Sequence, residues 1–181
     1  TNTQNVAIGS SALGTATGVN NVIAIGHRAA VALDHGDSSG TVAIGTKALE
    51  AANGAHAENI AIGNDAMKVH TSGGNNIAIG QNVMDDTDAG STSLGSQDNI
   101  FMGYDAGGGT WADAASSYNI GIGNYTLDAA LNGALNNVAI GHNALTGLTS
   151  GDNNIAIGTQ VMQSLTTGQG NIVMGHASGN N

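Results

Sequence analysis

A short apolar phrase recurs along the whole chain at nearly constant intervals. In its clearest copy, 137–141, a β-branched residue, a small residue and a large aliphatic residue stand between asparagine and glycine. A near-constant period of 17 to 23 residues is typical of a solenoid, in which each repeat adds one coil. The ten closing glycines are Gly9, Gly26, Gly45, Gly63, Gly80, Gly103, Gly123, Gly141, Gly158 and Gly175.

Large and small side chains alternate within each copy, which predicts a short β-strand. The residue three before the glycine is Val or Ile, the residue directly before it is Ile or Met, and the residue between them is usually Ala. Successive side chains of a strand point to opposite faces, so the two large residues share one face. We expect the large residues to fill the inside of the coil and the small residues to form a smooth outer face.

The rest of the repeat predicts the remainder of the coil. After the glycine come two variable residues and a small-plus-apolar pair such as Ala144-Leu145, which indicates a second short strand that turns back. Dipeptides such as Ser150-Gly151 and Ser72-Gly73 then mark a turn, in which glycine supplies a positive φ. One coil is therefore predicted to be strand, tight turn, strand and polar loop.

Most copies begin with asparagine, and in-register parallel strands would stack these amides one above another. Stacked amides can hydrogen-bond to each other along the column. Val22 and Thr41 interrupt the predicted ladder. The eight asparagines are Asn5, Asn59, Asn76, Asn99, Asn119, Asn137, Asn154 and Asn171.

The fold class that follows is all-β: a single parallel β-solenoid domain over residues 1–181, of about ten coils. The chain has 29 Gly but one Trp, one Phe and three Tyr, too few bulky residues for a conventional core. Each coil offers few aliphatic side chains, so we expect an obligate oligomer that covers the smooth face.

The charge and the composition exclude several classes of function. The net charge is −10, and the only basic residues are Arg28, Lys47 and Lys68, so nucleic acid and anionic bilayers should be repelled. Apolar runs are too short for membrane insertion. No residue pattern resembles a catalytic set, and we expect neither enzyme activity nor a cofactor.

The motif Asn-Val-Ala-Ile-Gly, followed by two variable residues and Ala-Leu, resembles the head repeats of trimeric autotransporter adhesins of the YadA type. Similar repeats also occur in bacteriophage tail fibres and other bacterial surface fibres. The motif is clearest at 59–67, 76–84, 137–145 and 154–162, and all ten copies carry a version of it. The coils here are longer than the simplest head repeats.

The resemblance implies a left-handed parallel β-roll and a homotrimer. It also implies an extracellular location, on a bacterial cell surface or in a virion tail fibre, and attachment to a cell-surface glycan or protein receptor. The alternative is a purely structural filament or spacer without a ligand, whose specific contacts are with copies of itself, end to end.

The aromatic residues indicate where a ligand could bind. All five lie between residues 101 and 125, inside the widened coils at about 81–125. We expect an aromatic platform with polar side chains beside it, because aromatic rings are large and stiff contact groups. The alternative is that the rings fill the wider coils, which Phe101 favours because it replaces a strand alanine. The candidates are Tyr104, Trp111, Tyr118, Tyr125, Asp98, Asp105 and Asp113.

Asp85, Asp86 and Asp88 are a weak candidate site for Ca²⁺, which prefers oxygen ligands. Their spacing fits no complete calcium loop, and a solvated acidic loop is the alternative. His142 directly follows a repeat glycine and is expected to be an exposed polar residue. His70 takes the place that Leu148 holds in a later copy, and we expect a tolerated neutral side chain there.

Overall fold

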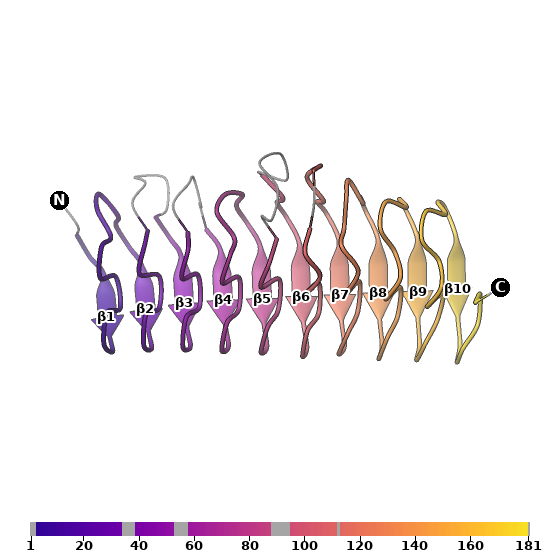
Figure 1. Ribbon diagram of the computed structural model, residues 1–181, viewed down its shortest axis with the longest axis horizontal. Helices are drawn as coiled ribbons and strands as arrows, with labels where there is room; N and C mark the ends of the chain where they lie inside the picture. Colours follow the sequence, from indigo (N-terminus) through magenta and orange to yellow (C-terminus); the bar gives the residue numbers. More distant parts are fainter. Residues whose placement is uncertain (1–2, 34–38, 53–57, 88–94, 112, 181) are drawn as a thin grey trace.

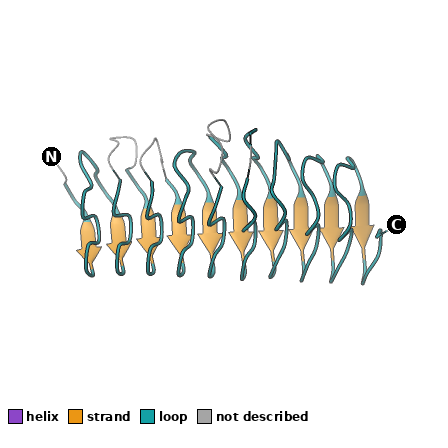
Figure 2. Ribbon diagram, viewed as in Figure 1, coloured by secondary structure: helices purple, strands orange, loops and turns teal. Residues whose placement is uncertain are grey.

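The computed structural model describes residues 3–33, 39–52, 58–87, 95–111 and 113–180, which form a rod around one parallel β-sheet (Figure 1). Ten strands follow one another in chain order, and each pairs in parallel with the next. Figure 2 shows all ten pointing the same way, with longer loops along one edge and tight turns along the other. The strands are β1 (Val6–Ile8), β2 (Ile23–Ile25), β3 (Val42–Ile44), β4 (Ile60–Ile62), β5 (Ile77–Ile79), β6 (Ile100–Met102), β7 (Ile120–Ile122), β8 (Val138–Ile140), β9 (Ile155–Ile157) and β10 (Ile172–Met174).

The predicted parallel β-solenoid is confirmed, and the described residues contain no helix. The strands pair without any shift in register, so that Val138 lies beside Ile155 and Ala139 beside Ala156. Like residues therefore stack in columns along the rod. The number of complete coils and the trimeric assembly stay predictions.

The side chain that points into the coil is the middle residue of the strand, which is small in most copies, so the predicted orientation was wrong. Ala139 and Ala156 are fully buried, whereas the large residues on either side of them are partly exposed. The coil is narrow, and buried residues such as Leu145 and Leu148 already fill it from the opposite wall. In these coils the strand has room inside for only a methyl group, so its large aliphatic side chains face outward.

The predicted second strand was also wrong, because a turn occupies its place. Asn143 and Leu145 have φ values of 57° and 52°, in the left-handed region that a strand cannot contain. The turn still bonds to its neighbours: Asn143 N donates to Asn124 O at 3.0 Å, and Leu145 N donates to Val161 O at 3.1 Å. The pair Ala144-Leu145 is buried, so its apolar character reports a core position and not a strand.

The glycine that closes each strand is required by the stacking of the coils. Gly103 and Gly141 have φ values of 142° and 122°. A Cβ at either position would lie 2.5 Å from the carbonyl oxygen of the corresponding glycine in the next coil. A side chain would therefore separate the coils, which explains the glycine in the nine copies that another repeat follows.

The loop glycines have two different roles. Gly73 has a φ of 107°, as the predicted turn requires. Gly151 has no positive φ, so that part of the prediction was wrong. A Cβ at Gly151 would lie 2.8 Å from Leu148 Cδ1, so glycine is needed there for close packing.

The asparagine ladder is confirmed as a column of buried amides. Asn137 Oδ1 accepts hydrogen bonds from the backbone N and from Nδ2 of Asn154, both at 3.0 Å. Asn137 Nδ2 donates in turn to Asn119 Oδ1 at 3.0 Å and to Gly151 O at 2.8 Å. An amide such as that of Asn137 thus bonds both to the asparagine of the next coil and to the loop that precedes that asparagine.

His70 and Thr87 occupy, on consecutive coils, the core position that Leu148 holds later in the rod. Both are fully buried, and His70 Nδ1 lies 2.7 Å from Thr87 Oγ1. His70 Nε2 lies 3.3 Å from Gly73 O and 3.4 Å from Asn76 Nδ2, so both ring nitrogens have polar partners inside the core. A polar pair replaces a leucine pair here.

Candidate functional site

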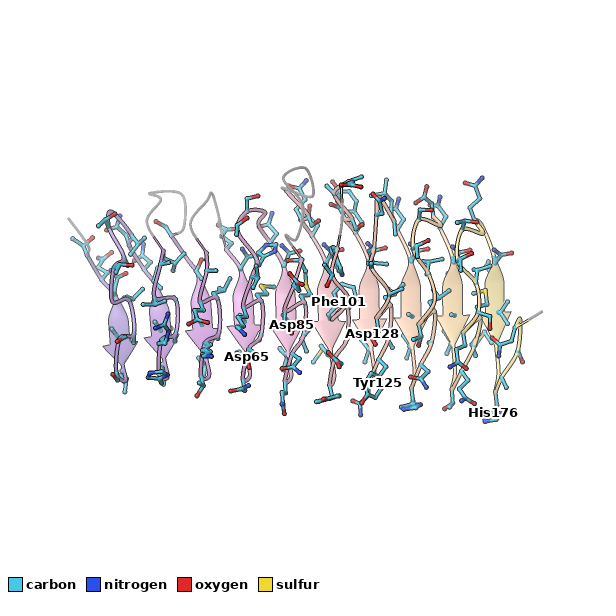
Figure 3. All side chains as sticks on the ribbon, viewed as in Figure 1. Asp65, Asp85, Phe101, Tyr125, Asp128 and His176 are labelled. Carbon is cyan, nitrogen blue, oxygen red and sulfur yellow. The ribbon has the colours of Figure 1, made fainter. Side chains whose placement is uncertain are left out.

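The tight-turn edge of the rod carries a row of three aromatic rings, Tyr104, Tyr125 and His142, here called the aromatic row. The centroids of Tyr104 and Tyr125 are 5.3 Å apart, and those of Tyr125 and His142 are 5.9 Å apart, both in edge-to-face geometry. Tyr104 is 38 % exposed. Figure 3 places Tyr125 at this edge, below the strands.

The turn backbone positions these rings. Tyr104 directly follows Gly103, and Tyr125 stands two residues after Gly123, where the chain is left-handed with a φ of 57°. Tyr125 N donates to Tyr104 O at 2.9 Å, and Tyr104 N donates to Asn124 Oδ1 at 3.0 Å. These bonds hold the two turns in contact, so the rings are fixed relative to each other.

Three carboxylates, those of Asp85, Asp105 and Asp128, lie beside the aromatic row, on the coils of β5, β6 and β7. Burial raises the pKa of Asp85 to about 6, and Asp105 and Asp86 add to the shift. Burial also raises the pKa of Asp128 to about 6, with Asp105 and Asp85 adding to it. The pKa of Asp105 is raised by burial as well.

The same neighbours act on the aromatic row. The pKa of Tyr125 is raised by desolvation, and then by Tyr104, Asp105 and Asp128. A neutral phenol beside half-buried carboxylates can donate a hydrogen bond to a ligand while the carboxylates accept one. This edge of the rod therefore combines aromatic surface with polar groups of both kinds.

Trp111 is not part of this surface, so its prediction as a ligand contact was wrong. Its side chain is fully buried, and its ring lies edge-to-face against Phe101 with centroids 5.9 Å apart. Trp111 Nε1 donates to Gly107 O at 3.1 Å, which satisfies its polar atom inside the core. The alternative prediction, that aromatic rings fill the wider coils, is confirmed for Trp111 and Phe101.

The other predicted site residues lie in different places. Tyr118, 51 % exposed, directly precedes the asparagine that opens its coil, and Asp98 holds the same position one coil earlier. Tyr118 N donates to Gln97 O at 3.2 Å, so the segments that carry Tyr118 and Asp98 stack on each other where the loop enters the strand. Asp113 is exposed in the long loop. Of the predicted residues, Tyr104, Tyr125 and Asp105 come together.

The predicted calcium residues do not assemble into a site among the described residues. Asp86 Oδ2 accepts a hydrogen bond from Thr110 Oγ1 at 2.8 Å. Asp88 lies outside the described residues. Within the described part of the chain, no group of three or more His, Cys, Asp or Glu residues is arranged to hold a metal ion.

Two residues of this region were missed from the sequence. Asp128 stands five residues after its repeat glycine, as Asp85 does, so aligning the repeats would have placed the two carboxylates in one column. His142 was recognised as an exposed position, but not as a neighbour of Tyr125. Counting positions from each glycine would have shown that consecutive coils bring these rings together.

The charged residues of the first coils surround a groove. Its lining includes Arg28, Glu50 and Lys68 around the apolar side chains of Val31 and Val69. Arg28 Nε donates to Glu50 Oε1, and Lys68 Nζ lies 3.9 Å from Asp65 Oδ1, so both cations of the groove have an acidic neighbour. This groove differs from the aromatic row in having basic side chains.

Comparisons with protein-family models, with curated proteins and with solved structures give no match. Among the described residues, no helix has the length and apolar character that crossing a membrane requires. The assignment of function therefore depends on the rod and on what it displays.

Proposed function

We propose that this chain is a segment of an extracellular fibre, on a bacterial cell surface or in a virion tail. In this proposal three copies associate as left-handed β-rolls, and the fibre attaches to a cell-surface glycan or protein through the aromatic row. The observation that carries the proposal is that three rings, each in contact with the next, line the tight-turn edge of a parallel rod.

The outward-facing aliphatic residues support the assembly. In the middle of the rod, Ile122 is 40 % exposed and Met102 is 37 % exposed, although both belong to the central sheet. Equivalent side chains repeat on every strand, so they form a continuous apolar face along the rod. Contiguous apolar surface of this kind marks an interaction site, and copies of the same chain supply a face of equal length and period.

The assembly is tested with Ile122→Asp, which places a charge in the centre of the apolar face. We expect the variant to sediment as a monomer where the unmodified chain sediments as a trimer, because a buried unpaired carboxylate is costly. Asn64→Asp, an exposed change on the tight-turn edge, is the control and should remain trimeric. A trimeric Ile122→Asp protein would refute this interface.

The attachment is tested with Tyr104→Asn and Tyr125→Asn in the assembled protein. Other repeats carry asparagine at these positions, at Asn64 and Asn143, so the turn geometry should be retained. We expect binding to a printed glycan array and to fixed cells to fall at least about tenfold, which corresponds to about 1.4 kcal/mol.

Tyr118→Asn is the matched control, because it removes an exposed tyrosine outside the aromatic row. It should bind as the unmodified chain does. If the two aromatic-row variants bind normally, these rings are not the attachment surface.

The second candidate function is a purely structural filament or spacer, which the burial of Phe101 and Trp111 favours. In that case the chain binds neither glycans nor cells, and its contacts are with copies of itself, including end-to-end contacts. Electron microscopy would then show long rods of uniform width in the absence of any receptor.

A further inference from the structure

Two columns of side chains face each other along one wall of the rod: the residues two and five positions after each repeat glycine. In the coil of β4, Asp65 Oδ1 lies 3.9 Å from Lys68 Nζ. Between the coils of β2 and β3, Arg28 pairs with Glu50. In this part of the rod the two columns bring opposite charges together.

On the next three coils the same columns bring carboxylates together. Asp85 and Asp128 stand five residues after their glycines, whereas the coil between them has Gly108 at that position. A Cβ at Gly108 would collide with Asp105 Oδ1, so the carboxylate of Asp105 occupies the space of the missing side chain. We call Asp85, Asp105 and Asp128 the carboxylate column.

The surroundings leave this column with little compensating charge. Consecutive coils of a parallel sheet are about 4.8 Å apart, so each carboxylate has a like charge on the adjacent coil. Among the described residues, the cation that acts on the column is Lys68, at one end of it, and no Lys or Arg follows Lys68 in the sequence. In the described part of the chain, the other titratable groups beside the column are Asp86 and Tyr125, and Tyr104 lies against Tyr125.

We propose that the carboxylate column is an acid-operated lock, which holds the coils of β5, β6 and β7 more tightly when mildly acidic conditions protonate it. A protonated carboxyl donates a hydrogen bond to a neighbouring carboxylate, whereas two ionised neighbours repel each other. Asp85 and Asp128 belong to the coils on either side of β6, the strand that carries the buried Phe101 (Figure 3).

The sign of the effect follows from the two raised pKa values. The pKa of Asp85 and of Asp128 is about 6 in the folded chain, against 3.8 without the fold. Between these values the folded state binds more protons than the unfolded state, so stability rises as the pH falls through 6 and is lost as the pH rises.

A full shift of about two pKa units would change the unfolding equilibrium about a hundredfold for one isolated group. Both carboxyls are half exposed and they share the same repulsion, so solvent screening and coupling reduce the sum. We expect a decrease of about tenfold in the unfolding equilibrium constant on acidification, after this discount.

The test compares thermal unfolding of the assembled protein at about pH 5 and about pH 7.5, at constant ionic strength. The unmodified protein should melt about 3 °C higher at the lower pH. The triple variant Asp85→Asn, Asp105→Asn, Asp128→Asn should be stabilised at the higher pH, and its acid stabilisation should be smaller. Asparagine keeps the shape of aspartate and tolerates the φ of 55° at Asp105.

Asp113→Asn, at an exposed aspartate, is the matched control and should keep the pH response of the unmodified protein. Other titratable groups, His70 among them, are common to all three proteins, so the difference between them isolates the column. If the triple variant does not fold, Asp105→Asn alone should show a reduced response.

The inference is overturned if the variants respond to pH as the unmodified protein does. It needs no ligand or receptor, so its result does not depend on the proposed attachment function.

Discussion

The coils of β6 and β7 and the coils of β8 and β9 share one backbone frame but are filled differently. In β8 and β9 the inward residues are Ala139 and Ala156, one methyl group on each coil. In β6 and β7 they are Phe101 and Gly121. All four strands keep the same parallel register.

The difference shows that volume is shared between consecutive coils. A Cβ at Gly121 would lie 2.5 Å from Phe101 Cδ1, so the ring of one coil uses the space that the next coil leaves empty. Trp111 packs edge-to-face against the same ring. The rod therefore tolerates a large core residue in one coil where its neighbour compensates.

Because all coils share one backbone frame, replacing a glycine that closes a strand should give the largest loss of stability. Gly103→Ala in the irregular part and Gly141→Ala in the regular part should each cost more than about 4 kcal/mol or prevent folding, because the new Cβ meets backbone that the sheet holds in place. Thermal unfolding followed by circular dichroism measures this. Gly18→Ala is the control: its φ is 71° with no atom within 4 Å of a Cβ, and it should cost about 1 kcal/mol. A mild loss at Gly103 alone would mean that the two frames differ.

The shared volume predicts a coupled effect that is specific to the irregular part. Phe101→Ala should cost about 3 to 5 kcal/mol because it leaves a cavity, and Gly121→Ala should cost about 1 to 3 kcal/mol because it overfills the core. The double variant restores the alanine pair of the regular coils.

The double variant should therefore cost less than the sum of the two single variants by at least about 1 kcal/mol. Chemical denaturation of the four proteins measures this coupling. Additive costs would show that the two positions do not share space.

The contrast also shows how far the sequence could be read. The columns were predictable, because in-register stacking follows from a repeated motif, and the amide ladder follows from stacked asparagines. The facing of the strand was not predictable from alternation, because alternation separates two faces without saying which is inside. The wall opposite the strand is built from turn residues with positive φ, such as Leu145, and the sequence pattern does not reveal this conformation. It therefore does not reveal why most coils have room only for alanine on the strand.

The candidate site was predictable only in part, for a related reason. Proximity in the sequence grouped Trp111 with Tyr104, although one lies in the core and the other on the turn edge. Position within the repeat separates them correctly. Trp111 lies near the place of the buried Leu148, whereas Tyr104 directly follows a repeat glycine.

The amide ladder predicts an effect that should be equal in the two parts of the rod. Asn119 Nδ2 donates to Ala134 O, and Asn154 Nδ2 donates to Gly168 O, at 2.8 and 2.7 Å. Asn119→Ala and Asn154→Ala should each cost about 2 kcal/mol, because Asn137 and Asn171, their partners on the next coil, lose their acceptor.

Chemical denaturation measures both losses, and Asn64→Ala, at an exposed asparagine, is the control that should change stability by less than about 0.5 kcal/mol. A clearly smaller loss at Asn119 than at Asn154 would mean that the wide aromatic coils relax around a missing amide. The irregular part would then differ from the regular part in its backbone frame as well as in its filling.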